Sequence, residues 1–261
     1  MYVYLPEKKQ DKAPIVVAIH YCGGSATAYF TFNNNKYATL ADTKGYIVIY
    51  PSAPSSGGCW DVASKQSLTH NGGGDSQTIV NMVKYAVDTY GGDPDRVFAT
   101  GTSSGAMMAN VLAGAYPDVF KGVTAYSGVA DGCFYVSGAT AGMSSPGWNN
   151  ACANGQSSKT AQAWGDLARS YYPGYTGSYP KVMIWHGTAD TTLRYPNYAE
   201  MLKQWSNVLA VDFSKNVSNT PEAKYTESVY GDGTKLLGFS AQGVGHNVPI
   251  HEQVELDFWG I

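Results

Sequence analysis

Short apolar runs alternate along the chain with longer segments in which apolar residues recur every three or four positions. The runs at 15–19 and 46–50 are continuous and rich in β-branched residues, as in strands buried on both faces of a sheet. Further strand patterns cover residues 97–99, 122–127, 181–185, 225–230 and 236–241. The helical patterns cover about residues 36–43, 75–90, 106–112, 160–171, 196–209 and 248–259. This alternation predicts a single α/β domain over residues 1–261, with a doubly wound, mostly parallel sheet and helices on both of its faces.

Two stretches interrupt the pattern. Residues 51–74 are rich in Ser, Gly and Pro and are too long for an idle connection. From about residue 129 to residue 159 the sheet pattern lapses, and Cys133 and Cys152 bracket most of this loop insertion, with Trp148 between them. Because long loops in compact domains tend to carry function, we expect both stretches to lie near a binding or catalytic site.

The clearest chemical motif is Gly101-Thr102-Ser103-Ser104-Gly105, which lies between the apolar run at 97–99 and the helical pattern at 106–112. Strand, sharp turn and helix is the context of a G-x-S-x-G nucleophile elbow, in which the central serine stands exposed at the turn. Glycine suits the two outer positions because a turn this tight leaves no room for a Cβ atom. The alternative is a Gly- and Ser-rich loop that matches the pattern by chance.

A nucleophilic serine needs a base and an acid, and in α/β-hydrolases the acid and then the histidine follow the serine along the chain. His246 lies in a glycine-flanked loop after the last strand pattern, where its imidazole can reach across the sheet edge, and we expect it to be the base. His186 ends a strand and is expected to be packed in place, whereas His251 falls in the closing helix.

Asp190 is the expected acid because it follows the run at 181–185 through a short loop, at the carboxyl end of a strand. The alternative role of this side chain is a helix cap or a turn. Asp166 and Asp212 are competing carboxylates, but both fall in or beside helical patterns. The sequence therefore predicts the order Ser103, Asp190, His246.

An acyl-transfer site also needs two N–H donors for the oxyanion, one from the residue after the nucleophile and one from a loop after an early strand. Ser104 is the first of these donors. The second lies in the loop of residues 20–24, where Cys22 is the expected donor, with Tyr21 or Gly23 as alternatives. The simpler interpretation of this loop, a glycine turn between strand and helix, is compatible with that role.

The four cysteines all fall in loops expected at the carboxyl edge of the sheet. We expect disulfides between Cys22 and Cys59 and between Cys133 and Cys152, each holding one of these loops in place. Four free buried thiols, as in a cytosolic protein, are the alternative.

Composition narrows the possible partners. The net charge of −3 disfavours nucleic acid, which requires a basic face. Only 14% of residues are charged whereas 20 are Tyr and 6 are Trp, a surface suited to sugars and other flat, uncharged ligands. No apolar run is long enough for a transmembrane helix. No His and Cys spacing fits zinc and no glycine loop carries a phosphate-binding lysine, so we expect no metal and no cofactor.

Weaker signals concern the compartment. Met1 leads directly into residues 2–5, which have the pattern of a strand rather than of a signal peptide, as in a trimmed mature domain. The sequon Asn216-Val217-Ser218 and the even number of cysteines point toward secretion.

With these residues in view, the chain resembles the fungal branch of carbohydrate esterase family 1, the acetylxylan and feruloyl esterases, and more distantly the poly(hydroxyalkanoate) depolymerases. The likeness covers nearly the whole chain; its motifs lie at residues 19–22, 58–61, 69–76, 101–108, 126–128, 147–149, 186–193 and 243–251. The resemblance implies an α/β-hydrolase fold, secretion, xylan carrying acyl esters as substrate, Ser103, Asp190 and His246 as the catalytic triad, and Cys22 and Ser104 as oxyanion donors.

The resemblance also implies that Trp148 forms one wall of the acyl pocket, and we expect Tyr21 and Trp60 to take part in substrate binding. A large indole narrows such a site toward acetate, but the segment at 139–146 is a few residues longer than in acetylxylan esterases and could move the wall. We therefore expect a monomeric feruloyl esterase, with acetylxylan esterase as the alternative. Remoter alternatives are a polyester depolymerase or lipase, and an inactive carbohydrate-binding homologue.

Overall fold

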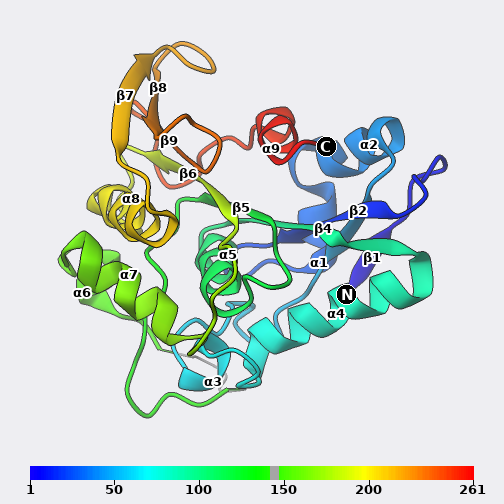
Figure 1. Cartoon of the computed structure of the whole chain (residues 1–261), viewed down its shortest axis with the longest axis horizontal. Helices are drawn as coiled ribbons and strands as arrows, with labels where there is room; N and C mark the ends of the chain where they lie inside the picture. The colour runs from blue at the N-terminus through cyan, green and yellow to red at the C-terminus, as the bar shows by residue number, and fades with distance from the viewer. Residues whose placement is uncertain (142–146) are drawn as a thin grey trace.

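A single sheet organises the computed structural model, which describes residues 1–141 and 147–261 (Figure 1). Its strands follow the order β1-β3-β2-β4-β5-β6-β9-β8-β7. Neighbours from β3 to β9 pair in parallel, whereas β1 on one edge and the β7–β8 hairpin on the other are antiparallel. The expected α/β-hydrolase fold, a mostly parallel sheet between helices in one domain, is confirmed.

The strands comprise β1 (Tyr2–Tyr4), β2 (Ala13–Ile19), β3 (Ile47–Tyr50), β4 (Gly92–Thr102), β5 (Gly122–Tyr126), β6 (Lys181–Gly187), β7 (Phe213–Ser218), β8 (Tyr225–Tyr230) and β9 (Leu236–Ala241). The helices are α1 (Ala26–Thr31), the short 3-10 helix η1 (Phe32–Asn35), α2 (Lys36–Lys44), α3 (Lys65–Leu68), α4 (Gly74–Tyr90), α5 (Ser104–Ala115), α6 (Asn150–Ala153), α7 (Ala161–Ser170), α8 (Pro196–Leu209) and α9 (Glu252–Trp259).

The apolar runs of the central strands, such as β2, β3 and β5, are buried because each of these strands faces a core on both sides. In β2, Ile15 and Val17 pack into the core beneath α4, α5, α7 and α8, whereas Val16 and Ala18 pack into the core beneath α1, α2 and α9. Side chains alternate between the two faces of a strand. In a central strand with helices on both sides, both sets of positions are buried and therefore apolar. Figure 1 shows α4 and α5 on one side of the sheet and α2 and α9 on the other.

The structure differs from the sequence predictions at several elements. The helices α1 and α3 and the strand β7 were not expected, and β4 begins at Gly92, before the expected start of its apolar run. The closing helix was expected from residue 248, but α9 begins at Glu252. Pro249 explains the late start, since the residue before a proline is disfavoured in helical conformation. His251 therefore precedes α9 and stacks on Trp185, with ring centroids 4.4 Å apart.

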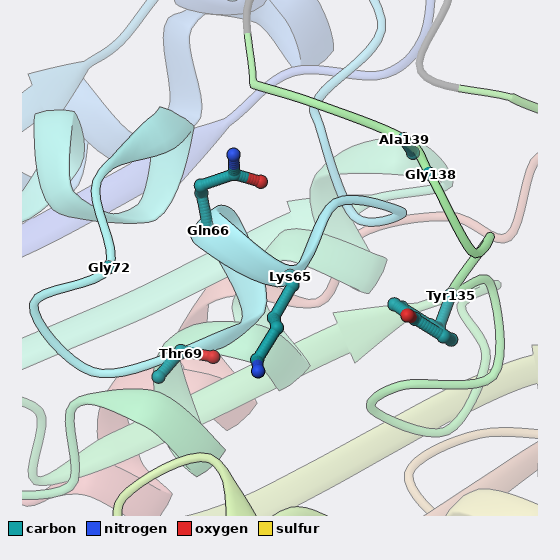
Figure 2. Close-up of a pocket in the computed structure, with 7 residues that line it drawn as sticks. All are labelled: Lys65, Gln66, Thr69, Gly72, Tyr135, Gly138 and Ala139. Atoms are coloured by element: carbon teal, nitrogen blue, oxygen red, sulfur yellow. The ribbon is translucent and has the colours of Figure 1, made fainter.

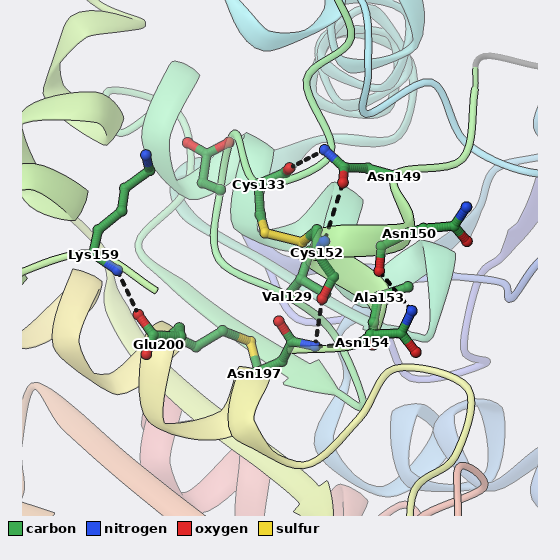
Figure 3. The surroundings of a disulfide bond; sticks show 12 residues. Val129, Cys133, Asn149, Asn150, Cys152, Ala153, Asn154, Lys159, Asn197 and Glu200 are labelled. Atoms are coloured by element: carbon green, nitrogen blue, oxygen red, sulfur yellow. Dashed lines mark hydrogen bonds between the residues drawn. A yellow bond between two sulfur atoms is a disulfide. The ribbon is translucent and has the colours of Figure 1, made fainter. Parts of the chain in front are cut away.

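Both expected disulfides are present. Cys22–Cys59 joins the loop after β2 to the loop after β3, and Cys133–Cys152 spans the insertion between β5 and α7 (Figure 3). Within that insertion, Asn149 caps α6 by accepting the Cys152 N–H at 3.0 Å and donates its amide to the Cys133 carbonyl at 3.2 Å. Among the described residues, no helix is long and apolar enough to cross a membrane.

Candidate active site

Ser103 occupies a strained turn between β4 and α5. Its φ of 57° and ψ of −117° lie in a region that residues with a side chain rarely adopt. The flanking glycines are required by contact: a Cβ on Gly101 would lie 2.4 Å from the Gly105 carbonyl, and a Cβ on Gly105 would lie 2.2 Å from the Ile19 carbonyl oxygen. The turn is thus pressed against the end of β2, which leaves the Ser103 side chain at the carboxyl edge of the sheet.

A chain of hydrogen bonds joins the three residues that the sequence places in order. His246 Nε2 lies 2.8 Å from Ser103 Oγ, and His246 Nδ1 lies 2.8 Å from Asp190 Oδ2. The Asp190 side chain is fully buried, whereas that of His246 is 19% exposed. A carboxylate bound to Nδ1 keeps the proton on that nitrogen, so Nε2 is free to accept the serine proton.

The loop that carries His246 is fixed to the loop that carries Asp190. The Ala189 N–H donates to the Val244 carbonyl at 2.9 Å, and the Gly243 N–H donates to Thr188 Oγ1 at 2.9 Å. Gly187 permits the close approach, since a Cβ there would lie 2.2 Å from the Val244 carbonyl oxygen. These contacts hold the backbone of the His246 loop in place and so determine where its imidazole lies.

Asp190 is surrounded by donors. Its Oδ1 accepts the backbone N–H groups of Thr192 at 2.8 Å and Leu193 at 3.0 Å. Burial by itself would raise the pKa of this carboxyl, but the hydrogen bonds and charges of His186 and His246 outweigh burial and hold the pKa well below its usual range. Asp190 is therefore ionised at neutral pH.

His186 is packed and hydrogen-bonded in place, as expected, but sequence reasoning missed its contact with Asp190. His186 is fully buried, and its Nε2 lies 2.7 Å from the Leu193 carbonyl oxygen and 3.3 Å from Asp190 Oδ2. Because the Leu193 carbonyl can only accept, Nε2 carries the proton and points between the two oxygens. The spacing of His186 and Asp190 along the chain was the available signal, but it does not show which atoms meet.

The loop of residues 20–24, where the second oxyanion donor is expected, lies against the elbow. The Trp60 N–H donates to Ser104 Oγ at 2.8 Å, and the Trp60 indole donates to the His20 carbonyl at 2.8 Å. The Gly23 N–H is already bonded to the Gly57 and Gly58 carbonyls, at 3.1 and 3.2 Å. Gly23, one of the alternative donors, is thereby engaged elsewhere. Of the two remaining candidates, Cys22 lines the same cavity as Ser103 and Ser104, whereas Tyr21 does not.

His20 also stabilises this loop. Its Nε2 accepts the Ala53 N–H at 3.1 Å, so its Nδ1 carries the proton and donates to the Tyr21 carbonyl at 2.7 Å. Burial lowers the pKa of His20, which favours this neutral form.

Beside Ser103 is a cavity of about 170 Å³ with a largely apolar wall. It is lined by Cys22, Cys59, Trp60, Val62, Ser103, Ser104, Met107, Phe134, Gly147, Trp148 and Thr192. Trp148 is 54% exposed and packs edge-on against Phe134, with ring centroids 5.2 Å apart. The cavity is therefore suited to an apolar group attached to a carbonyl at Ser103.

Of the three substrate-binding residues expected from the sequence, two line the cavity and one does not. Trp60 and Trp148 line the cavity, although Trp60 is nearly buried and its indole is bonded to the His20 carbonyl. Tyr21 is not among the lining residues; its ring packs edge-on against Tyr29 and Phe32 instead. Of the segment 139–146, whose length was raised as a reason for a displaced wall, residues 142–146 lie outside the described residues.

The competing side chains are elsewhere. Asp166 in α7 pairs with Arg169 at 2.8 Å, and Asp212 precedes β7. Within the described parts of the chain, no group of three or more His, Cys, Asp or Glu side chains could hold a metal ion. The chemistry available here is that of a hydroxyl, an imidazole and a carboxylate in line.

Comparison with known proteins decides the family. Residues 30–213 match the model of the prolyl oligopeptidase family. Feruloyl esterase B of Talaromyces funiculosus is 49% identical over the whole chain, which covers 72% of that protein. Acetylxylan esterase A of Aspergillus ficuum is 48% identical, with 84% of that protein covered. The chain belongs to the prolyl oligopeptidase family and, by its close relatives, to the acetylxylan and feruloyl esterases. The protein is thus a carboxylic ester hydrolase.

Solved structures agree with this family. The acetyl xylan esterase from Aspergillus awamori superposes with a TM-score of 0.94 at 46% identity, covering 99% of this chain and 93% of that one. The feruloyl esterase module from Clostridium thermocellum, at 16% identity and a TM-score of 0.54, shares the fold alone; it covers 94% of this chain and 76% of that one. The family match ends before His246, so it covers Ser103 and Asp190 but not all three of the hydrogen-bonded residues.

Proposed function

We propose that this enzyme is a secreted serine esterase that removes acyl side groups from xylan, with feruloyl and related hydroxycinnamoyl groups preferred. The observation that supports it most strongly is the continuous hydrogen-bonded line from Ser103 Oγ through His246 to Asp190. The choice of xylan as the polymer is supported by the names of the relatives, which include both acetylxylan and feruloyl esterases.

In the proposed mechanism, Ser103 Oγ attacks the ester carbonyl while His246 Nε2 takes its proton. Asp190, which remains ionised, holds the His246 ring and stabilises the imidazolium that forms. The tetrahedral intermediate collapses when His246 returns the proton to the leaving sugar oxygen, which leaves an acyl group on Ser103. Water then attacks this acyl-enzyme, again with His246 as base, and the free acid departs.

The negative charge on the carbonyl oxygen requires donors that are in place before the reaction. We assign this role to the backbone N–H groups of Ser104 and Cys22. The Cys22–Cys59 disulfide and the Trp60 indole hold the loop of residues 20–24 in place. These donors therefore need little rearrangement during catalysis.

The size of the acyl cavity supports the preference for a large acyl group. At about 30 Å³ for each molecule in liquid water, a cavity of about 170 Å³ has room for several waters, whereas an acetyl methyl group is about as large as one. Trp60, Phe134 and Trp148 would surround an aromatic ring with aromatic walls. Acetylxylan esterase is the second candidate, because Trp148 is retained and the Aspergillus awamori enzyme shares nearly the whole structure.

Secretion and a monomeric state belong to the same proposal. The two disulfides suit an oxidising environment, where such bonds persist. The sequon residue Asn216 lies exposed on β7, where a sugar could be attached.

The test is a comparison of kcat/KM on methyl ferulate, acetylated xylan and a long-chain fatty ester. We expect methyl ferulate to be turned over fastest. Faster deacetylation of xylan would establish the acetylxylan alternative, and a preference for the fatty ester would overturn the assignment to xylan side groups.

A further inference from the structure

A groove adjoins the acyl cavity without belonging to it. It consists of hollows of about 470, 240 and 300 Å³ that share lining residues. The first two share Lys65 and Tyr135, and the last two share Tyr135, Leu167 and Tyr171. Figure 2 shows the first hollow, with Lys65 from α3 and Tyr135 from the loop after β5 on opposite sides of it. We call this continuous surface the Tyr135 groove.

The chain segments that separate the Tyr135 groove from the acyl cavity are one residue thick. Cys133 and Tyr135 line the groove whereas Phe134, between them, lines the cavity. On the neighbouring segment, Trp148 lines the cavity and Asn149 lines the groove. The Cys133–Cys152 disulfide and the hydrogen bond from Asn149 to the Cys133 carbonyl join these two segments (Figure 3). The groove and the cavity therefore have these two segments as a common wall.

The groove has the surface of a carbohydrate site. Tyr135 is 44% exposed, and its ring offers a face on which a pyranose can stack. Gln66 and Thr69 offer an amide and a hydroxyl group for sugar hydroxyls.

The charge of the groove is opposite to that of the whole protein. The chain carries a net charge of −3, yet the described lining residues of all three hollows include Lys65 and Lys159 and no Asp or Glu. Neither ammonium group forms an ion pair with a described residue. Lys159 Nζ lies 5.3 Å from the Trp164 ring centroid, and the nearby Glu200 is occupied by Lys203 at 2.7 Å. A neutral sugar has no negative charge that could pair with either ammonium group.

We propose that the Tyr135 groove binds an oligosaccharide that carries a uronic acid, with a pyranose face on Tyr135 and the carboxylate paired with Lys65 or Lys159. This inference rests on the proposed function only in placing the groove beside a site for polysaccharide esters. The ligand class is an acidic xylan segment, which the acyl cavity alone does not select.

Calorimetric titration of the whole protein tests the proposal with two deacylated xylo-oligosaccharides of equal length, one with a single glucuronic acid and one neutral. At about 20 mM salt we expect the acidic ligand to bind at least about fivefold more tightly, and about 500 mM salt to abolish most of the difference. The Lys65→Gln, Lys159→Gln double variant should bind both ligands alike. Lys84→Gln, which alters an exposed lysine of α4 outside the groove, is the matched control and should retain the preference.

Equal affinities for the two oligosaccharides, or a preference that survives the double variant, would overturn the proposal. The Tyr135→Ala variant adds an independent measurement, since it should weaken binding of both ligands. The oligosaccharides carry no ester, so their binding does not depend on catalysis. A protein that binds the acidic ligand yet hydrolyses neither feruloyl nor acetyl esters would support the groove proposal and refute the proposed function. An active xylan esterase without the charge preference would support the proposed function and refute the groove proposal.

Discussion

Asp190 shows how much of the site is decided by single residues. One of its oxygens faces the backbone N–H groups of Thr192 and Leu193, and the other faces His246 and His186. The order of Ser103, Asp190 and His246 along the chain suggested the pairing with His246. The approach of His186 could not be predicted, because it depends on how tightly the loop after β6 turns back on itself.

Asp190→Asn is the corresponding prediction. The amide would keep the shape of the side chain, but it would remove the charge that stabilises the imidazolium and would favour the wrong tautomer of His246. We expect kcat to fall by roughly 10⁴ with little change in KM. Steady-state kinetics on methyl ferulate measures this change. A loss smaller than about tenfold would show that Asp190 does not act on His246.

At the scale of elements, the strand, turn and helix around Ser103 were recognisable because steric requirements leave traces in the sequence. Only glycine fits at positions 101 and 105, and both positions have it. By contrast, β7 is almost entirely exposed and carries no alternation of apolar and polar residues. It becomes a strand by pairing with β8, a tertiary contact that no local pattern reports. The short α3, with a single helical turn, is too short to show a helical repeat of apolar residues.

The Gly105→Ala variant separates local propensity from tertiary contact. Helix propensity predicts that alanine at this position of α5 stabilises the protein. The contact with the Ile19 carbonyl oxygen, 2.2 Å from the added Cβ, predicts a loss of about 1–3 kcal/mol or more in the free energy of unfolding. Urea unfolding decides the sign. Ala106→Gly, one position along the same helix, is the control and should cost about 1 kcal/mol. A stabilised Gly105→Ala protein would contradict the packing described for the elbow.

The whole molecule is organised by two cores, and one of them contains an unusual acid. Glu255 of α9 is fully buried and accepts the hydroxyls of Tyr126 at 2.6 Å and Tyr37 at 2.9 Å. Burial raises the pKa of Glu255 to about 8; the charge of Glu252 adds to the effect, and the hydrogen bonds of Tyr126 and Tyr37 oppose it. The sequence pattern placed α9 on the sheet, but a glutamate in the core is visible only once the layers are assembled.

This burial predicts the pH dependence of stability. The folded protein binds a proton that the unfolded chain releases near pH 4.5, so the contribution of Glu255 is fully present below that pH and is lost as pH rises toward about 8. The loss amounts to at most roughly 5 kcal/mol in the free energy of unfolding. Urea unfolding across this pH range should show a smaller decline in Glu255→Gln than in the wild type. Glu7→Gln, at an exposed site, is the control, and equal slopes in all three proteins would refute the role of Glu255.

The most direct test of the whole account is kcat of the Ser103→Ala protein on methyl ferulate and on a small acetate ester. The account predicts a fall of roughly 10⁶ on both substrates, with an unchanged midpoint of urea unfolding, because the variant removes only the hydroxyl that His246 deprotonates. A folded variant that keeps activity within about tenfold of the wild type would contradict the assignment of Ser103 as nucleophile.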